Sequence, residues 1–307
     1  MSKIAFIYPG QGAQKAGMGA DFYQENETAR YIYDEASNVL DLDMKALCFE
    51  PNDKLDITEY TQAALVTTCL AMTRVAESKG LKADMTAGLS LGEYCAIAAA
   101  GGMNDIDAIR LVRKRGILMQ NTVPAGEGAM CAVLAMDEKA IEEETDSIDG
   151  VTIANYNCPG QIVITGKTEA VQAAAEKLKE AGAKRTVMLN VSGPFHSPML
   201  QPAGEELAHE LAQTQFHALK IPYVTNVTAE AVTDITKTET LLQEQVSSPV
   251  RWMQSMEYMI ANGVDTFVEI GPGRTLAGFM KKINREVKVY NIAVWDDVDK
   301  VVKELTE

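Results

Sequence analysis

Apolar residues follow two spacings along the chain, and the spacing changes from one stretch to the next. Continuous apolar runs, typical of buried parallel strands, cover residues 4–8 and 266–270, and we also expect strands at residues 84–87 and 221–226. Helical spacing predicts helices over residues 23–39, 62–79, 91–100, 105–121, 203–213, 240–246, 251–262 and 274–284. Strands that alternate with helices indicate a mostly parallel sheet, with functional sites at the carboxyl ends of its strands.

The pattern differs in the middle of the chain, after Pro124-Ala125-Gly126. Strands are expected at residues 129–136, 151–156, 161–165 and 185–191, and helices at residues 137–146 and 167–181. This βαββαβ order is that of a ferredoxin-like module. We therefore predict an α/β protein in which a mostly parallel sheet domain, residues 1–125 and 193–307, carries an inserted ferredoxin-like subdomain, residues 126–192.

Composition narrows the class of protein. The 307 residues are 47% hydrophobic and 23% charged, as in a soluble globular protein, and the net charge of -15 argues against nucleic acid or membrane as a partner. The 5 cysteines are scattered without C-x-x-C spacing, so we expect reduced thiols and no metal site. We also expect no cofactor. No stretch approaches the ~18 apolar residues of a membrane span. We expect a cytoplasmic protein.

The stretch Gly88-Leu89-Ser90-Leu91-Gly92 fits the pattern G-x-S-x-G between a predicted strand and a predicted helix. At such a corner the serine lies on a sharp turn that exposes its hydroxyl, and the helix that follows offers unpaired backbone N–H groups. The pattern therefore predicts a nucleophile with part of an oxyanion hole. The alternative interpretation is a glycine-rich turn with a capping serine.

Arg115 lies on the apolar face of the helix predicted over residues 105–121. At about 100° per residue it falls among Ile109, Leu111 and Val112, whereas the other basic residues of the helix fall outside this arc. A buried guanidinium needs an anion, because an unpaired buried charge is very unfavourable. The anion is either a carboxylate of the core or the carboxylate of a substrate, which arginine binds with two hydrogen bonds.

A serine nucleophile needs a base, and the chain has 3 histidines. His209 lies in a charged helical stretch and His217 in a connector, so neither is a strong candidate. His196 lies in a Gly/Pro-rich loop where the inserted module meets the returning domain, and such junctions line clefts. His196 is therefore the predicted base, with a turn histidine held by neighbouring serines as the alternative. No aspartate is indicated as a third member, so a dyad is expected.

The loop Pro9-Gly10-Gln11-Gly12 follows the first predicted strand. It fits neither the dinucleotide-binding fingerprint, because Lys15 occupies the position of the third glycine, nor a phosphate-binding loop. The loop therefore needs another role, and a backbone N–H donor near the active site is one.

Taken in order, the motifs resemble the malonyl-CoA:acyl carrier protein transacylases, acyltransferases of fatty acid and polyketide synthesis. The resemblance covers nearly the whole chain and its ordered set of motifs is very specific. The motifs are Pro9-Gly10-Gln11-Gly12, Gly88-Leu89-Ser90-Leu91-Gly92-Glu93, Arg115-Gly116 with Met119-Gln120, Asn157-x-Pro159-Gly160-Gln161, Phe195-His196-Ser197, Gln245-x-x-x-Pro249-Val250 and Glu269-Ile270-Gly271-Pro272-Gly273.

The resemblance implies a fold and roles for the site residues. The fold would be a hydrolase-like α/β domain with the ferredoxin-like insertion. Ser90 would carry the malonyl group as an ester, and His196 would be the base and then the acid. Backbone N–H groups of Gln11 and Leu91 would form the oxyanion hole. The remaining substrate contacts would come from Arg115, which would bind the malonyl carboxylate, Gln245, whose backbone carbonyl would orient His196, Phe195, which resembles the malonyl-selecting variant, and Asn157.

The implied activity is that of an [acyl-carrier-protein] S-malonyltransferase. It would transfer malonyl from malonyl-CoA to the phosphopantetheine thiol of acyl carrier protein through a malonyl-serine ester, by a ping-pong mechanism, in fatty acid biosynthesis. We expect a monomer. The chain departs from the family at Leu89, where histidine is usual, which affects the polar lining near the serine and not the base.

Three other functions remain open. A serine esterase or thioesterase would use water as the acceptor, but its substrates offer Arg115 no anion. A stand-alone acyltransferase that serves a polyketide synthase can barely be distinguished by sequence from the transacylase of fatty acid biosynthesis. A non-catalytic carrier-binding module would leave Ser90 unacylated.

Overall fold

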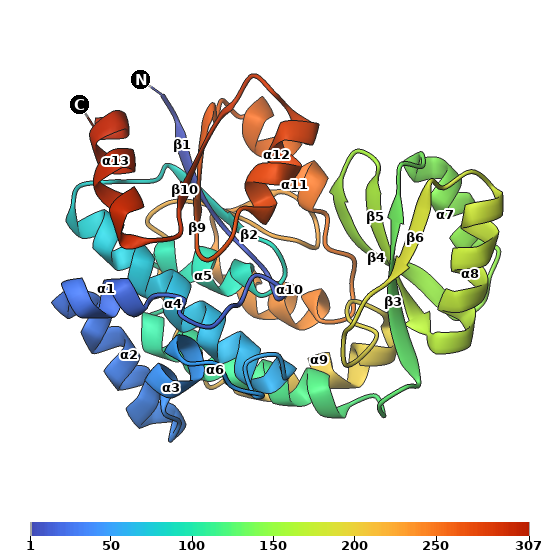
Figure 1. The fold of residues 1–307 in the computed structure, drawn as a ribbon, viewed down its shortest axis with the longest axis horizontal. Helices are drawn as coiled ribbons and strands as arrows, with labels where there is room; N and C mark the ends of the chain where they lie inside the picture. The colour runs from blue at the N-terminus through green and yellow to red at the C-terminus, as the bar shows by residue number, and fades with distance from the viewer. Residues whose placement is uncertain (1, 307) are drawn as a thin grey trace.

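The computed structural model describes residues 2–306 and contains two sheets (Figure 1). The larger has 6 strands in the order β10-β9-β1-β2-β7-β8, all parallel to their neighbours except β8, which pairs antiparallel with β7. Its strands are β1 (Ile4–Tyr8), β2 (Met85–Gly88), β7 (Tyr223–Val224), β8 (Ala231–Val232), β9 (Thr266–Ile270) and β10 (Lys288–Ile292).

Helices cover both faces of this sheet. In β1, Phe6 and Tyr8 pack on one side with residues of α4 (Thr58–Ser78) and α5 (Gly92–Ala99). Ala5 and Ile7 pack on the other side with residues of α11 (Trp252–Ala261) and α12 (Thr275–Ile283). This double burial explains the continuous apolar run in the sequence. The helices of this part are α1 (Ala20–Glu25), α2 (Glu27–Leu40), α3 (Met44–Phe49), α4 (Thr58–Ser78), α5 (Gly92–Ala99), α6 (Asp105–Asn121), α9 (Gln201–Leu211), α10 (Thr238–Gln245), α11 (Trp252–Ala261), α12 (Thr275–Ile283) and α13 (Trp295–Thr306).

The smaller sheet is formed by one continuous stretch in the middle of the chain, on the right of Figure 1. Its elements are β3 (Gly128–Leu134), α7 (Glu138–Asp146), β4 (Val151–Cys158), β5 (Gln161–Lys167), α8 (Thr168–Glu180) and β6 (Arg185–Met188). The sheet is antiparallel with the order β4-β5-β3-β6, so the predicted ferredoxin-like βαββαβ arrangement is confirmed. The proposed subdomain boundaries, residues 126–192, enclose it.

The two parts meet where β4 lies beside the segment that follows α10. Val250 donates its N–H to Ala154 at 2.8 Å and accepts the N–H of Tyr156 at 2.9 Å, which extends the small sheet toward the large domain. One face of the small sheet packs on α7 and α8, whereas Met130, Ala132 and Val163 of the other face turn toward the large domain. A cleft therefore lies between this face and the carboxyl ends of the parallel strands.

Some predicted elements differ in extent from those observed. The helix expected over residues 23–39 is broken at Asn26, whose side chain accepts the N–H groups of Thr28 and Ala29 at 2.9 and 3.3 Å and so begins a new helix. The strand expected at residues 221–226 is limited to Tyr223–Val224, and that at residues 185–191 ends at Met188. Among residues 2–306, no helix is both long and apolar enough to cross a membrane.

Candidate active site

Ser90 lies on a sharp corner between β2 and α5, with a backbone φ of 50°. This left-handed conformation is uncommon for a residue with a side chain. Glycines on both sides allow it, because a Cβ on Gly88 would collide with the backbone of Gly92, and a Cβ on Gly92 would collide with the carbonyl of Tyr8. The corner is therefore packed directly against β1.

Asn226, which follows β7, holds the corner in place. Its Oδ1 accepts the N–H of Ser90 at 2.6 Å and its Nδ2 donates to the carbonyl of Gly88 at 2.7 Å. Both backbone groups would otherwise be unpaired near the core, which is unfavourable by about 1–3 kcal/mol each. The side chain of Asn226 thus stabilises the strained conformation of Ser90 from the loop that follows the neighbouring strand β7.

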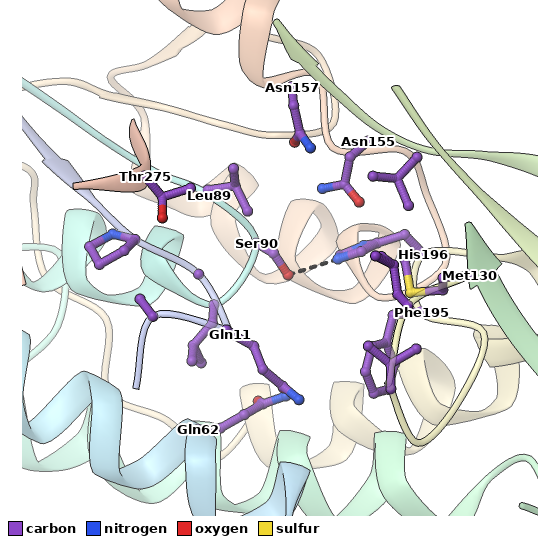
Figure 2. A pocket seen from close by; sticks show the side chains of 18 of the residues that line it. Gln11, Gln62, Leu89, Ser90, Met130, Asn155, Asn157, Phe195, His196 and Thr275 are labelled. Atoms are coloured by element: carbon purple, nitrogen blue, oxygen red, sulfur yellow. Dashed lines mark hydrogen bonds between the residues drawn. The ribbon is translucent and has the colours of Figure 1, made fainter. Parts of the chain in front are cut away.

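The hydroxyl of Ser90 and the imidazole of His196 face each other (Figure 2). Ser90 Oγ lies 2.7 Å from His196 Nε2, and His196 Nδ1 lies 2.9 Å from the backbone carbonyl of Gln245. Because a carbonyl only accepts, Nδ1 carries the proton and Nε2 is free to accept one from the serine. The fold thus brings Ser90 and His196, which are 106 positions apart in the sequence, into direct contact.

His196 is 4% exposed, and its environment disfavours the protonated ring. Burial, and then the positive charge of Arg115, lower the pKa of His196 to about 4. The imidazole is therefore neutral at physiological pH, as a general base must be.

The pKa of His196 gives a first prediction. In NMR spectra of protein with isotope-labelled histidine, the His196 signals should not titrate between about pH 8 and about pH 5. Arg115→Ala should move the midpoint of the His196 titration upward, since it removes a positive neighbour. His196→Ala identifies the signals. A wild-type midpoint near 6.5, the ordinary value, would show that the ring is not held neutral.

Two backbone N–H groups beside Ser90 are unused. Leu91 is the residue before α5, and Gln11 lies in the loop after β1, which is adjacent to β2 in the sheet. Neither N–H has a hydrogen-bond acceptor among residues 2–306. Both residues line the same pocket as Ser90 and His196, so their N–H groups are suited to a developing oxyanion.

Arg115 is 1% exposed and points from α6 into the pocket. Its guanidinium donates to Gln62 Oε1 at 2.9 Å, Gln245 Oε1 at 3.0 Å and Ser90 Oγ at 3.2 Å. No carboxylate of residues 2–306 forms an ion pair with it, and its Nε has no partner there. Burial lowers the pKa of Arg115. The predicted alternative, a structural salt bridge, is therefore absent from the described part of the chain.

The pocket has a volume of about 260 Å³ and lies between the two sheets. In Figure 2, Asn155 and Asn157 of β4 lie on one side of Ser90, and Gln62 of α4 on the other. Asn157 Oδ1 is buried without a partner among residues 2–306. Phe195 and Leu89 form apolar parts of the pocket wall. Leu89, where the family usually has histidine, therefore contributes no polar side chain to the pocket.

Residues 5–303 match the family model for the acyl transferase domain. The chain belongs to the acyl transferase domain family. Among curated relatives, the malonyl CoA-acyl carrier protein transacylase of Bacillus subtilis (strain 168) is 44% identical over 312 residues, covering 100% of this chain and 98% of the relative. That of Staphylococcus aureus (strain MRSA252) is 43% identical over 303 residues, covering 97% of this chain and 98% of the relative.

Solved structures of acyl transferases share the fold. An acyl carrier protein S-malonyltransferase from Vibrio cholerae superimposes with a TM-score of 0.95 at 41% identity, covering 98% of this chain and 100% of that one. A malonyl-transacylase called PlMCAT, in complex with the type II polyketide synthase acyl-carrier protein AntF, gives a TM-score of 0.96 at 36% identity, covering 99% of this chain and 100% of that one.

Sequence reasoning about this acyl transferase missed four buried polar side chains that surround the pocket. They are Gln62, Glu93, Asn226 and the side chain of Gln245. A signal for Glu93 exists, because it is the lone charged residue in the apolar helix of residues 91–100. Gln62 likewise lies in a long apolar helix. A polar residue within a buried helix requires a partner and so indicates a polar site nearby.

Proposed function

We propose that this acyl transferase is an [acyl-carrier-protein] S-malonyltransferase, which moves malonyl from malonyl-CoA to the phosphopantetheine thiol of acyl carrier protein in fatty acid biosynthesis. The names and full-length identity of the curated relatives support this activity. The single observation that carries it is a buried guanidinium 3.2 Å from the Ser90 hydroxyl. A malonyl ester brings a carboxylate next to its reacting carbonyl, which is the anion that Arg115 needs.

In the first half-reaction, Ser90 Oγ attacks the thioester carbonyl of malonyl-CoA while His196 Nε2 takes its proton. The N–H groups of Gln11 and Leu91 stabilise the oxyanion, and loss of one such donor lowers the rate by roughly 10²–10³-fold. The carbon–sulfur bond then breaks, and CoA leaves as a thiol with the proton from His196. The product is a malonyl ester of Ser90.

In the second half-reaction, the thiol of the carrier's phosphopantetheine attacks that ester and gives its proton to His196. The ester bond breaks, the same proton returns to Ser90 Oγ, and malonyl leaves on the carrier. No net proton is taken up or released. The backbone carbonyl of Gln245 keeps the imidazole in the tautomer that both halves require.

Selectivity follows from the walls of the pocket. An acyl group without a carboxylate would leave the charge of Arg115 unpaired, and a site built around a buried polar group rejects such analogues. The ring of Phe195, adjacent to His196, limits room for a branched acyl group. Asn157, with its unpartnered Oδ1, is suited to accept a hydrogen bond from an amide of the pantetheine arm.

Incubation with radiolabelled malonyl-CoA, with and without carrier protein, tests the proposal. Label on the protein that moves to the carrier, with little free malonate, is expected. Rapid release of malonate without transfer would instead support the serine esterase or thioesterase. The structure of a malonyl-transacylase with a polyketide carrier makes polyketide synthesis the second candidate setting, and kcat/KM with fatty acid and polyketide carriers distinguishes the two. The monomeric state stays a prediction.

A further inference from the structure

A carboxyl group is completely buried beneath the nucleophile. Glu93, in the first turn of α5, is 0% exposed. Its Oε2 accepts Gln245 Nε2 at 2.6 Å and the N–H of Asn226 at 3.2 Å, whereas its Oε1 has no hydrogen-bond partner among residues 2–306. Burial raises the pKa of Glu93 to about 7, although the hydrogen bond from Gln245 opposes the rise. The proposed steps of acyl transfer do not use this group.

The contact between Glu93 and Gln245 fixes the orientation of an amide. Gln245 Nε2 also donates to the backbone carbonyl of Ser90 at 3.0 Å, and Gln245 Oε1 accepts from Arg115 at 3.0 Å. If the amide turned over, its oxygen would face two oxygen acceptors and its NH₂ would face the guanidinium. The hydrogen bond to the carboxyl oxygen of Glu93 is the shortest of the three, and together with the Ser90 carbonyl and Arg115 it selects the observed orientation.

We propose that Glu93 is a positioning residue for substrate selectivity, which acts through the side-chain amide of Gln245 to hold Arg115 ready for a substrate carboxylate. This inference rests on the proposed function. The amide separates the guanidinium from the carboxyl group, so the two form no direct ion pair. A direct pair would occupy the guanidinium that the malonyl carboxylate is to bind. Acyl groups without a carboxylate form no ion pair with Arg115, so loss of Glu93 should lower acylation by malonyl more than acylation by such groups.

Because Oε1 of Glu93 has no partner among residues 2–306, two variants can separate a role in positioning Gln245 from a role of the negative charge. A proton on Oε1 leaves the contacts of Oε2 intact, and glutamine at this position has the same shape with an oxygen available for Gln245. Glu93→Gln should therefore keep the orientation of the amide, whereas Glu93→Ala removes the shorter of the two hydrogen bonds that the Gln245 NH₂ donates. The effect of interest is the ratio of kcat/KM for malonyl-CoA to kcat/KM for acetyl-CoA in acylation of Ser90.

We expect Glu93→Ala to lower this ratio on the order of 10-fold, within the range measured for coupled buried neighbours. Glu93→Gln should keep the ratio within about 3-fold of wild type. Glu269→Ala is the matched control, because Glu269 is equally buried and accepts hydrogen bonds from Leu276, Ala277 and Asn291 but none from the Arg115 network. It should lower the melting temperature without changing the ratio.

Equal losses for malonyl and acetyl in Glu93→Ala would overturn the inference and assign Glu93 a structural role. If the ratio fell as far in Glu93→Gln as in Glu93→Ala, the inference would be overturned, and the negative charge of Glu93 would be what selectivity requires. If Glu93→Ala does not fold, Gln245→Ala is measured in its place. A malonyl-to-acetyl ratio in Gln245→Ala equal to that in Glu93→Gln would contradict the proposal. Wild-type protein that accepts no malonyl group overturns the proposed function and this inference together, whereas unchanged selectivity in the variants overturns the inference alone.

Discussion

Arg115→Ala is expected to lower kcat/KM for malonyl-CoA on the order of 10²-fold, while kcat/KM for acetyl-CoA falls much less. The guanidinium is buried, unpaired with any carboxylate of residues 2–306, and directed at the site beside Ser90. Its removal deprives the malonyl carboxylate of its charge partner in the pocket. Acylation rates with the two thioesters, measured separately by rapid quench, provide the ratio.

Arg113→Ala is the matched control on the same helix. Arg113 forms its ion pair with Glu59 at 3.0 Å, outside the pocket, so its loss should leave the ratio of malonyl to acetyl unchanged. If Arg115→Ala reduced both thioesters by the same factor, Arg115 would be a structural residue and the basis for malonyl selectivity would be lost.

His196→Ala should slow formation of the acyl-serine by roughly 10²–10⁴-fold, the usual contribution of a general base. In contrast to Arg115→Ala, the loss should be the same for malonyl and acetyl, because the proton transfer is common to both. Intact-mass measurement over time gives the rate for each acyl group. His209→Ala, an exposed residue of α9, should stay within about 2-fold of wild type.

A small effect of His196→Ala would mean that another group takes the proton of Ser90. The 2.7 Å contact would then be structural, like the turn histidine that the sequence left open.

The sequence predicted those parts of the site in which a local pattern determines the geometry. The corner at Ser90 follows from glycines that accommodate close backbone contacts, and the inward direction of Arg115 follows from helical spacing alone. The βαββαβ insertion could be recognised because its strands and helices are short, regular and separated by turns. Each of these signals lies within a few tens of residues.

The missed features of the site depend on contacts between distant segments, and the missed strands are short or half-exposed. β8 has 2 residues, and β10 is an edge strand of mostly half-buried residues with neither a continuous apolar run nor a regular alternation, so neither strand has a clear pattern. Asn226 lies 136 positions from Ser90 in the sequence, and Gln245 lies 152 positions from Glu93. Only the folded sheet brings these amides and the carboxyl group together beneath the nucleophile.

The central claim is that one serine, activated by His196 and flanked by Arg115, carries the malonyl group. Intact-mass measurement after brief mixing with malonyl-CoA tests it most directly, with Ser90→Ala measured in parallel. We expect wild-type protein to gain the mass of a single malonyl group, located on Ser90 by peptide mapping, and Ser90→Ala to gain none. Malonylation of the alanine variant to the same extent, or wild-type protein that stays unmodified while malonyl still reaches the carrier, would contradict the account.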